Sequence, residues 1–157
     1  MSHIDNYGIT PPYKTIALFG ANGQIGDRIL NTLLNTDRHQ FEIIAFIPPT
    51  SQLQTGQNEK KNVPTKTFDL TKIKCEELTS ELQGVDAVVS ALNGKTLEIR
   101  STIQDAAADA GVKRFVPSEY GMHHIYRKPG DPKGYIHPAW NMKNEYAFLI
   151  CINISQV

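Results

Sequence analysis

A glycine-rich segment near the start of the chain has the residue types and spacing of a phosphate-binding turn. It lies between an apolar run, residues 15–19, and an amphipathic helical pattern. It consists of Gly20, Ala21, Asn22, Gly23, Gln24, Ile25 and Gly26. Gly20 permits a tight turn, Gly23 lets a pyrophosphate approach the backbone, and Gly26 lets the helix pack closely on a sheet. N–H groups at a helix start attract anions, so this context favours dinucleotide binding over a purely structural turn.

Such a turn needs a strand before it and a helix after it, and the whole chain has this alternation. Apolar runs alternate with helical patterns, which is typical of βαβ units. Strands are expected at residues 15–19, 41–47, 65–68, 85–91 and 115–116. Helices are expected after the glycine turn, at 73–82, at 99–110 and from about residue 138. Right-handed crossovers then predict an α/β fold with a doubly wound parallel sheet of strand order 3-2-1-4-5.

Ligands of such sheets bind at the carboxyl ends of the strands, beside the point where the strand order reverses. This places Ser90, Ala91 and Leu92, at the end of the fourth expected strand, beside the glycine turn. Asp69 follows the third strand and either lines an adenine pocket or caps the next helix. Glu119 follows the fifth strand, where it is a candidate general acid or base, although we favour a role in anchoring its loop.

Composition and charge restrict the partners. The 157 residues include 16 Lys and Arg and 16 Asp and Glu, so the net charge is zero. Neither nucleic acid nor an anionic membrane is therefore expected as a partner. Cys75 and Cys151 form no C-x-x-C pair and are expected to be reduced in a cytoplasmic protein. No apolar run has transmembrane length, and no histidine spacing matches a metal-ligand motif, so no metal is expected.

The end of the second strand is where nicotinamide cofactors are usually distinguished. An acidic residue there binds the ribose of NAD, and an arginine accepts the extra phosphate of NADP. This chain has Pro48, which does neither. Ser51, Lys60 and Lys61 are nearby candidates for a phosphate, although solvated charge is the simpler interpretation of the two lysines. These residues leave the choice between NAD and NADP open.

Four segments together resemble the NmrA-like and isoflavone reductase-like family of atypical short-chain dehydrogenases. They are residues 20–26 (GANGQIG), 68–70 (FDL), 84–92 (GVDAVVSAL) and 111–122 (GVKRFVPSEYGM). The last closely follows the family's V-K-R-F-x-P-S-E-F-G signature and is the most specific. The resemblance implies an NAD(P)-binding Rossmann domain over residues 13–150, after a flexible leader at 1–12 and before an atypical stub at 151–157.

The resemblance also implies a chemistry. The family uses NADPH, so NADP is favoured over NAD, with a small molecule as the substrate. Its F-x-x-K phrase matches Trp140 to Lys143, which gives Lys143 a catalytic or cofactor-orienting role; an exposed helix lysine is the alternative. A lysine partly desolvated beside a nicotinamide ribose can have a lowered pKa suited to proton transfer. The ordinary Tyr-x-x-x-Lys arrangement is absent because Ala139 occupies the tyrosine position.

Members of this family continue into a substrate lobe well beyond the length of this chain. We therefore expect a truncated Rossmann domain that lacks the substrate lobe and does not turn over substrate. Three hypotheses follow: an isoflavone reductase-like oxidoreductase, a non-catalytic NmrA-like regulator that senses dinucleotide and binds a partner protein, or an inactive fragment. The missing strands would leave the fifth strand as an edge, so self-association is also expected.

Overall fold

The computed structural model describes residues 13–37, 39–53 and 63–120. The chain divides into two units, Met1–Ser118 and Glu119–Val157, and every strand and helix described belongs to the first. The helix expected from about residue 138, which carries Lys143, lies outside the described residues. Among those that are described, no helix is both long and apolar enough to cross a membrane.

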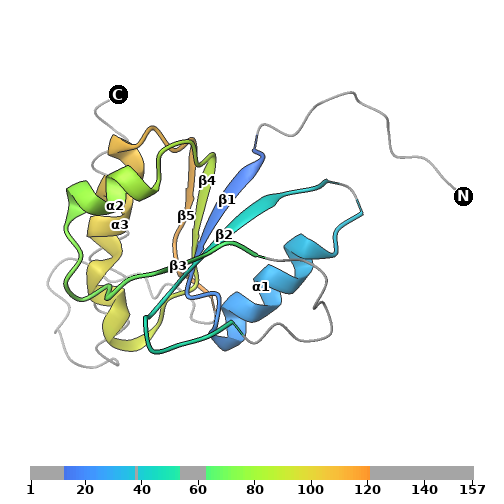
Figure 1. Ribbon diagram of the computed structural model, residues 1–157, viewed down its shortest axis with the longest axis horizontal. Helices are drawn as coiled ribbons and strands as arrows, with labels where there is room; N and C mark the ends of the chain where they lie inside the picture. The colour runs from blue at the N-terminus through green and yellow to red at the C-terminus, as the bar shows by residue number, and fades with distance from the viewer. Residues whose placement is uncertain (1–12, 38, 54–62, 121–157) are drawn as a thin grey trace, which may run out of the picture. The chain divides into compact units, whose positions relative to one another are not determined.

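Five parallel strands form one sheet in the order β3-β2-β1-β4-β5 (Figure 1). The strands are β1 (Thr15–Phe19), β2 (Glu42–Ile47), β3 (Thr65–Thr67), β4 (Ala87–Ser90) and β5 (Arg114–Val116). The predicted strand order is therefore confirmed, and each observed strand lies within the range expected from the sequence except β5, which begins one residue earlier, at Arg114. The order reverses at β1, because its two neighbours are β2 on one side and β4 on the other.

Helices cover both faces of this sheet, which confirms the doubly wound architecture. Figure 1 shows α1 (Gln24–Leu34) on one face and α2 (Cys75–Glu81) with α3 (Arg100–Asp109) on the other. A six-residue 3₁₀ helix, η1 (Gly94–Ile99), leads directly into α3. The periodic pattern predicted a helix only from residue 99, because the five residues before it carry no helical pattern of apolar side chains.

The central strands are apolar on both sides because a helix layer covers each side. Ala17, Phe19 and Val88 belong to the core beneath α2 and α3. Leu18 and Ala45 belong to the core beneath α1. Phe19 stacks on Phe46 of the neighbouring strand, with ring centroids 4.4 Å apart. Successive side chains of β1 point to opposite faces of the sheet, so both cores anchor the strand. This fixes the position of the turn that follows it.

Asp86 joins three strands at the edge where they begin. Its carboxylate accepts hydrogen bonds from the backbone N–H groups of Lys14 (2.8 Å) and Thr15 (3.0 Å), just before and at the start of β1. It also pairs with Lys113, just before β5, with 2.7 Å between Nζ and Oδ1. These donors hold the pKa of Asp86 well below its usual range, the Lys113 ammonium contributing most. The edge of the sheet where the strands begin is therefore stabilised by contacts of its own, separate from those at the edge where the strands end.

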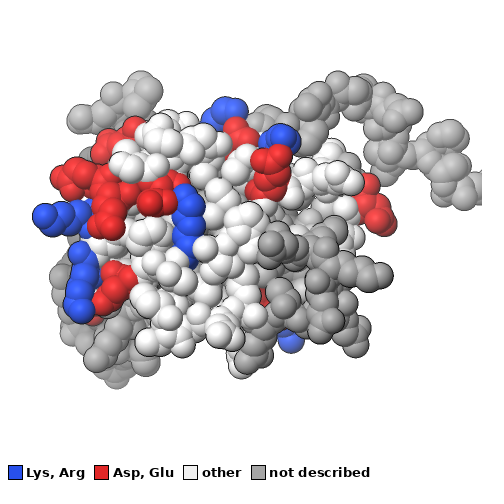
Figure 2. Space-filling view, in the orientation of Figure 1, with Lys and Arg blue, Asp and Glu red and all other residues white. Residues whose placement is uncertain are grey.

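Acidic side chains gather over α2 on the face shown in Figure 2. Glu76 and Glu77 lie in the first turn, where negative charge stabilises the positive end of a helix. Glu81 receives two hydrogen bonds from the ammonium of Lys66 in β3, one to its carboxylate (2.5 Å) and one to its carbonyl (3.1 Å). This pair ties the edge strand β3 to α2.

Candidate functional site

The glycine turn joins β1 to α1 at the carboxyl edge of the sheet. Gly20 has a φ of +78°, a backbone conformation that favours glycine. Its N–H donates to the carbonyl of Phe46 (3.1 Å), and its own carbonyl accepts from the N–H of Gly23 (3.0 Å). A Cβ on Gly20 would lie 2.9 Å from the carbonyl oxygen of Ala91. Both the conformation and the space around Gly20 therefore require glycine.

Gly26 brings the first turn of α1 directly onto the turn backbone. A Cβ at this position would lie 2.0 Å from the carbonyl oxygen of Gly20 and 2.9 Å from Cα of Ala21. Both contacts are with backbone, which cannot rotate away as a flexible side chain could. The absence of a side chain at Gly26 is thus what allows the helix to begin where it does.

Gly23 is the N-cap of α1 and leaves the start of the helix open. Its φ of −84° and ψ of 167° are extended, and within the described part of the chain no side chain caps the helix. Among the described residues, a Cβ on Gly23 would meet only the carbonyl oxygen of Gly20, at 3.4 Å, which is ordinary van der Waals contact. The N–H groups of the first helical turn normally need an external partner. An uncapped helix start bordered by open space is a suitable place for an anionic group.

The helical spacing of five apolar residues after the glycine turn predicts one stripe that faces the core, and Ile25 departs from it; the five are Ile25, Ile29, Leu30, Leu33 and Leu34. Leu30 is buried against the sheet, and Ile29, Leu33 and Leu34 pack beside it. Ile25 is 44% exposed, so the prediction that it faces the core was wrong. The reason is its place in the first turn of α1, which begins at the carboxyl edge, where the strands beneath the helix end. Its side chain is left at the surface next to the uncapped helix start.

The end of β4 lies against the glycine turn, so the sequence-predicted residues from β1 and β4 come together. Phe19 and Ser90 are paired in the sheet register, and Ala91 donates its N–H to the carbonyl of Phe19 (2.9 Å). Leu92 places a side-chain carbon 3.3 Å from where a Cβ of Gly20 would be. Ser90, Ala91 and Leu92 are all buried. Within the described residues, the hydroxyl of Ser90 has no hydrogen-bond partner.

Ser118 reinforces this edge; its place after the fifth expected strand predicts that it lies at the ligand edge, but the sequence assigns no role to its hydroxyl. It follows β5 and is buried, and its hydroxyl donates to the carbonyl of Leu92 at 2.5 Å. The 111–122 segment that carries the family signature contains Ser118, so the signal was present. What the sequence could not show is that the hydroxyl reaches a backbone carbonyl 26 residues earlier in the chain.

Asp69 forms a local turn instead of capping α2. Its carboxylate accepts hydrogen bonds from the N–H (3.1 Å) and the hydroxyl (2.6 Å) of Thr71 and pairs with Lys72 (3.1 Å). These contacts lower the pKa of Asp69, with the Thr71 hydroxyl contributing most. The N-cap of α2 is Lys74, which makes no side-chain cap. The capping alternative for Asp69 was therefore wrong, and the adenine-pocket alternative stays a prediction.

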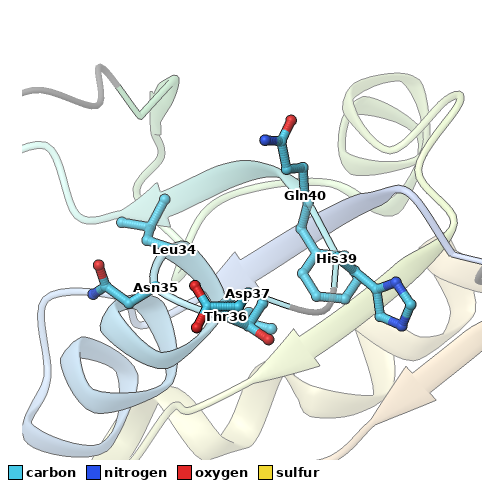
Figure 3. A pocket seen from close by; sticks show the side chains of 8 residues that line it. Leu34, Asn35, Thr36, Asp37, His39 and Gln40 are labelled. Carbon is cyan, nitrogen blue, oxygen red and sulfur yellow. The ribbon is translucent and has the colours of Figure 1, made fainter. Parts of the chain in front are cut away.

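Two hollows lie at the opposite edge of the sheet, where the strands begin. One, of about 520 Å³, is formed by residues 33–37 and 39–41, between the end of α1 and the start of β2 (Figure 3). The other, of about 550 Å³, runs past Thr15, Glu42 and Pro64 where β1, β2 and β3 begin. Ligands of doubly wound sheets bind at the carboxyl ends, so we assign the site from the glycine turn and not from these hollows.

Of the other residues considered for the cofactor or the catalytic site, the structure describes Pro48 and Ser51 but not the three lysines. The chain turns immediately after β2, where the carbonyl of Pro48 accepts from the N–H of Ser51 (3.0 Å). Lys60, Lys61 and Lys143 lie outside the described residues. Over residues 13–37, 39–53 and 63–120, no group of three or more His, Cys, Asp and Glu side chains is arranged to hold a metal ion.

Known proteins share both the sequence and the fold of this domain. The chain is 31% identical over 113 residues to asnovolin J 5′,6′-dehydrogenase of Aspergillus novofumigatus, an alignment that covers 68% of this chain and 33% of that one. An NADPH-dependent quinone oxidoreductase of Escherichia coli, solved with NADPH, superimposes with a TM-score of 0.51 at 26% identity, covering 64% of this chain and 35% of that one. Leucoanthocyanidin reductase of Vitis vinifera, solved with NADPH, shares the fold, with a TM-score of 0.65 at 21% identity over 86% of this chain and 44% of that one.

These matches cover only part of the proteins concerned. The chain spans about a third of the length of the curated relatives it matches. The model of the NmrA-like family, by contrast, matches residues 12–146, which is most of the chain. On the strength of that match and of the Rossmann sheet that accompanies it, the chain belongs to the NmrA-like family.

Proposed function

We propose that this chain binds a nicotinamide dinucleotide across the carboxyl edge of its sheet, with the pyrophosphate on the glycine turn. The observation that carries the proposal is the environment of Gly23. It caps α1 without a side chain, and a Cβ there would meet, among the described residues, only the Gly20 carbonyl oxygen, at 3.4 Å. A phosphate placed there would meet the N–H groups and the positive end of α1.

NADPH is the proposed cofactor in preference to NADH. Two solved proteins with this fold carry NADPH, the Escherichia coli quinone oxidoreductase and the Vitis vinifera leucoanthocyanidin reductase. The residue that follows β2 here is Pro48, so the acidic side chain that would bind the ribose of NAD is absent from that position. The arginine that usually accepts the extra phosphate of NADP is absent from this position as well, so the preference for NADPH rests on these two proteins and on the family.

The proposed activity is an NADPH-dependent reduction of a small molecule. A bound nicotinamide dinucleotide supplies a hydride to the substrate. The chain's own contribution is to bind and orient the dinucleotide at the glycine turn and to provide a proton. We assign the proton to the ammonium of Lys143, on its match to the family's lysine phrase. In a protein that carries both this domain and a substrate lobe, replacing Lys143 with alanine should leave the NADPH dissociation constant unchanged while abolishing NADPH oxidation against a panel of enones and other carbonyl compounds. The chain as given is expected to bind NADPH without oxidising it.

The binding proposal can be tested with a single methyl group. Gly23→Ala fits the unliganded turn, because its Cβ would make only one ordinary contact. The same methyl group would stand where the pyrophosphate approaches the amides. Each hydrogen bond to a charged group contributes about 1.5–3 kcal/mol, and 1.4 kcal/mol is about tenfold in affinity. We therefore expect NADPH to bind Gly23→Ala at least about tenfold more weakly in calorimetric titration.

The matched control is Gly111→Ala, a glycine that ends the α3 segment. No atom of the described residues lies within 4 Å of a Cβ there, but φ is positive, so the variant carries backbone strain away from the site. It should bind NADPH as the unaltered protein does. Equal NADPH affinity for Gly23→Ala and the unaltered protein, with both folded, would show that the pyrophosphate is not bound at this turn.

A further inference from the structure

Buried polar side chains are concentrated at one place in the described part of the chain. Three polar or charged side chains there are buried: Ser90, Arg100 and Ser118. Ser90 ends β4, Arg100 begins α3 after the crossover from β4, and Ser118 follows β5. All three therefore lie toward the carboxyl ends of β4 and β5, on the far side of β1 from β2. Buried polar groups cost stability unless they are bonded, so their grouping here needs an explanation.

The hydrogen bond of Ser118 connects the end of β5 to the glycine turn through two intermediate residues. Its hydroxyl donates to the carbonyl of Leu92. Leu92 and the residue before it in turn border Gly20. A Cβ on Gly20 would lie 3.3 Å from the Leu92 side chain and 2.9 Å from the Ala91 carbonyl oxygen. The segment from Ala91 to Leu92 is thus held between Gly20 and Ser118. Without the hydroxyl, one side of this segment would lose its anchor.

The topology says which half of a dinucleotide this segment would face. In a doubly wound sheet, the residue that follows the second strand reads the adenosine ribose, and the pyrophosphate lies on the first turn. The adenosine half therefore lies toward β2, and the other half extends over β4 and β5. Ala91, Leu92 and Ser118 are on that second side of the turn.

We propose that Ser118 is a positioning residue for the nicotinamide half of the cofactor. It acts through Leu92 and does not itself need to touch the dinucleotide. By fixing the carbonyl of Leu92, its hydroxyl holds the segment from Ala91 to Leu92 at the distance from the glycine turn that the nicotinamide half requires. This inference rests on the proposed dinucleotide function and extends it by assigning a role to a hydroxyl outside the glycine turn.

The test compares two ligands that share the adenosine half. Calorimetric titration of the full chain with NADPH reports on both halves, whereas 2′,5′-ADP reports on the adenosine half alone. Ser118→Ala should bind NADPH about five- to tenfold more weakly, the size of one ordinary hydrogen bond. Its affinity for 2′,5′-ADP should remain that of the unaltered protein. Cysteine has nearly the same volume as serine but is a weaker hydrogen-bond donor. The NADPH affinity of Ser118→Cys should therefore lie between those of Ser118→Ala and the unaltered protein.

The matched control is Ser80→Ala on α2. It also removes a hydroxyl that donates to a backbone carbonyl, that of Glu76 at 3.0 Å, but away from the carboxyl edge. Both ligands should bind Ser80→Ala normally. Equal weakening of NADPH and 2′,5′-ADP in Ser118→Ala would show that the hydroxyl merely supports the fold, and no weakening would show that it positions nothing; either result overturns the inference. If the unaltered protein binds neither ligand, the proposed function itself is wrong, which is a different result from either of these.

Discussion

Replacing Gly26 with alanine should destabilise the protein, although the same change in a helix is ordinarily favourable. Alanine is better than glycine in a helix by about 1 kcal/mol, and Gly26 is a helical residue of α1. Its Cβ, however, would lie 2.0 Å from the Gly20 carbonyl oxygen, where ordinary contact begins at 3.4 Å. The atoms in the way belong to the backbone of the turn, so relief requires α1 to move away from it.

The expected size of the effect follows from these two opposing contributions. Inserting a carbon into a close-packed region costs about 1–3 kcal/mol, and a backbone clash of this depth belongs at the upper end. Subtracting the gain in helix propensity leaves a loss of about 2 kcal/mol in the free energy of unfolding. For a chain of this length that corresponds to a fall in Tm of about 4–8 °C. Thermal and urea denaturation followed by circular dichroism would measure it.

Gly23→Ala, three residues earlier in the same turn, is the control. The only described atom near its Cβ is the Gly20 carbonyl oxygen, at 3.4 Å, so the stability of this variant should change by about 1 kcal/mol or less, the range of N-cap substitutions. If Gly26→Ala instead raised the Tm, helix propensity would be the dominant effect. The close packing of α1 on the Gly20 backbone, on which the geometry of the site depends, would then be refuted.

Two further predictions concern stability. The lowered pKa of Asp86 means that its contribution to stability is complete above the ordinary carboxyl pKa, about 3.9, and is lost as the pH falls toward the folded-state pKa. The free energy of unfolding, measured by urea denaturation between pH 7 and 3, should therefore fall less in Asp86→Asn than in the unaltered protein. An equal fall in the two proteins would contradict this. Ser90→Ala removes a buried hydroxyl that has no partner among the described residues, so the free energy of unfolding should rise by about 1 kcal/mol; a clear decrease would mean that the hydroxyl is bonded after all.

The parallel sheet could be predicted from the sequence because its signals are local. The run from Thr15 to Phe19 is apolar without alternation, as a strand covered on both faces must be. The glycines that end α2 and α3, Gly84 and Gly111, have positive φ values, as the turns there require. Strand order then follows from the handedness of the crossovers. No long-range information is needed for any of these steps.

The features that could not be predicted depend on where each helix begins in the fold or on contacts between segments far apart in the chain. Ile25 follows the helical pattern but lies past the strand ends, so its exposure is a consequence of where α1 begins. Asp69 has the residue type of a helix cap, yet it bonds Thr71 because α2 starts later. The bond from Ser118 to Leu92 joins two connections far apart in the chain. A pattern in one segment contains no information about its partner in another.

The central claim is that the dinucleotide binds at the uncapped start of α1, and backbone amide shifts test it most directly. When the isotopically labelled chain is titrated with NADPH and followed by NMR, the account predicts saturable changes in the chemical shifts of the backbone amides of Gln24, Ile25 and Gly26. The amides of Gly84 and Gly111, which lie outside the site, should stay in place. Saturable shifts confined to residues 33–41, around the hollow at the amino edge, with none in the glycine turn, would contradict the account.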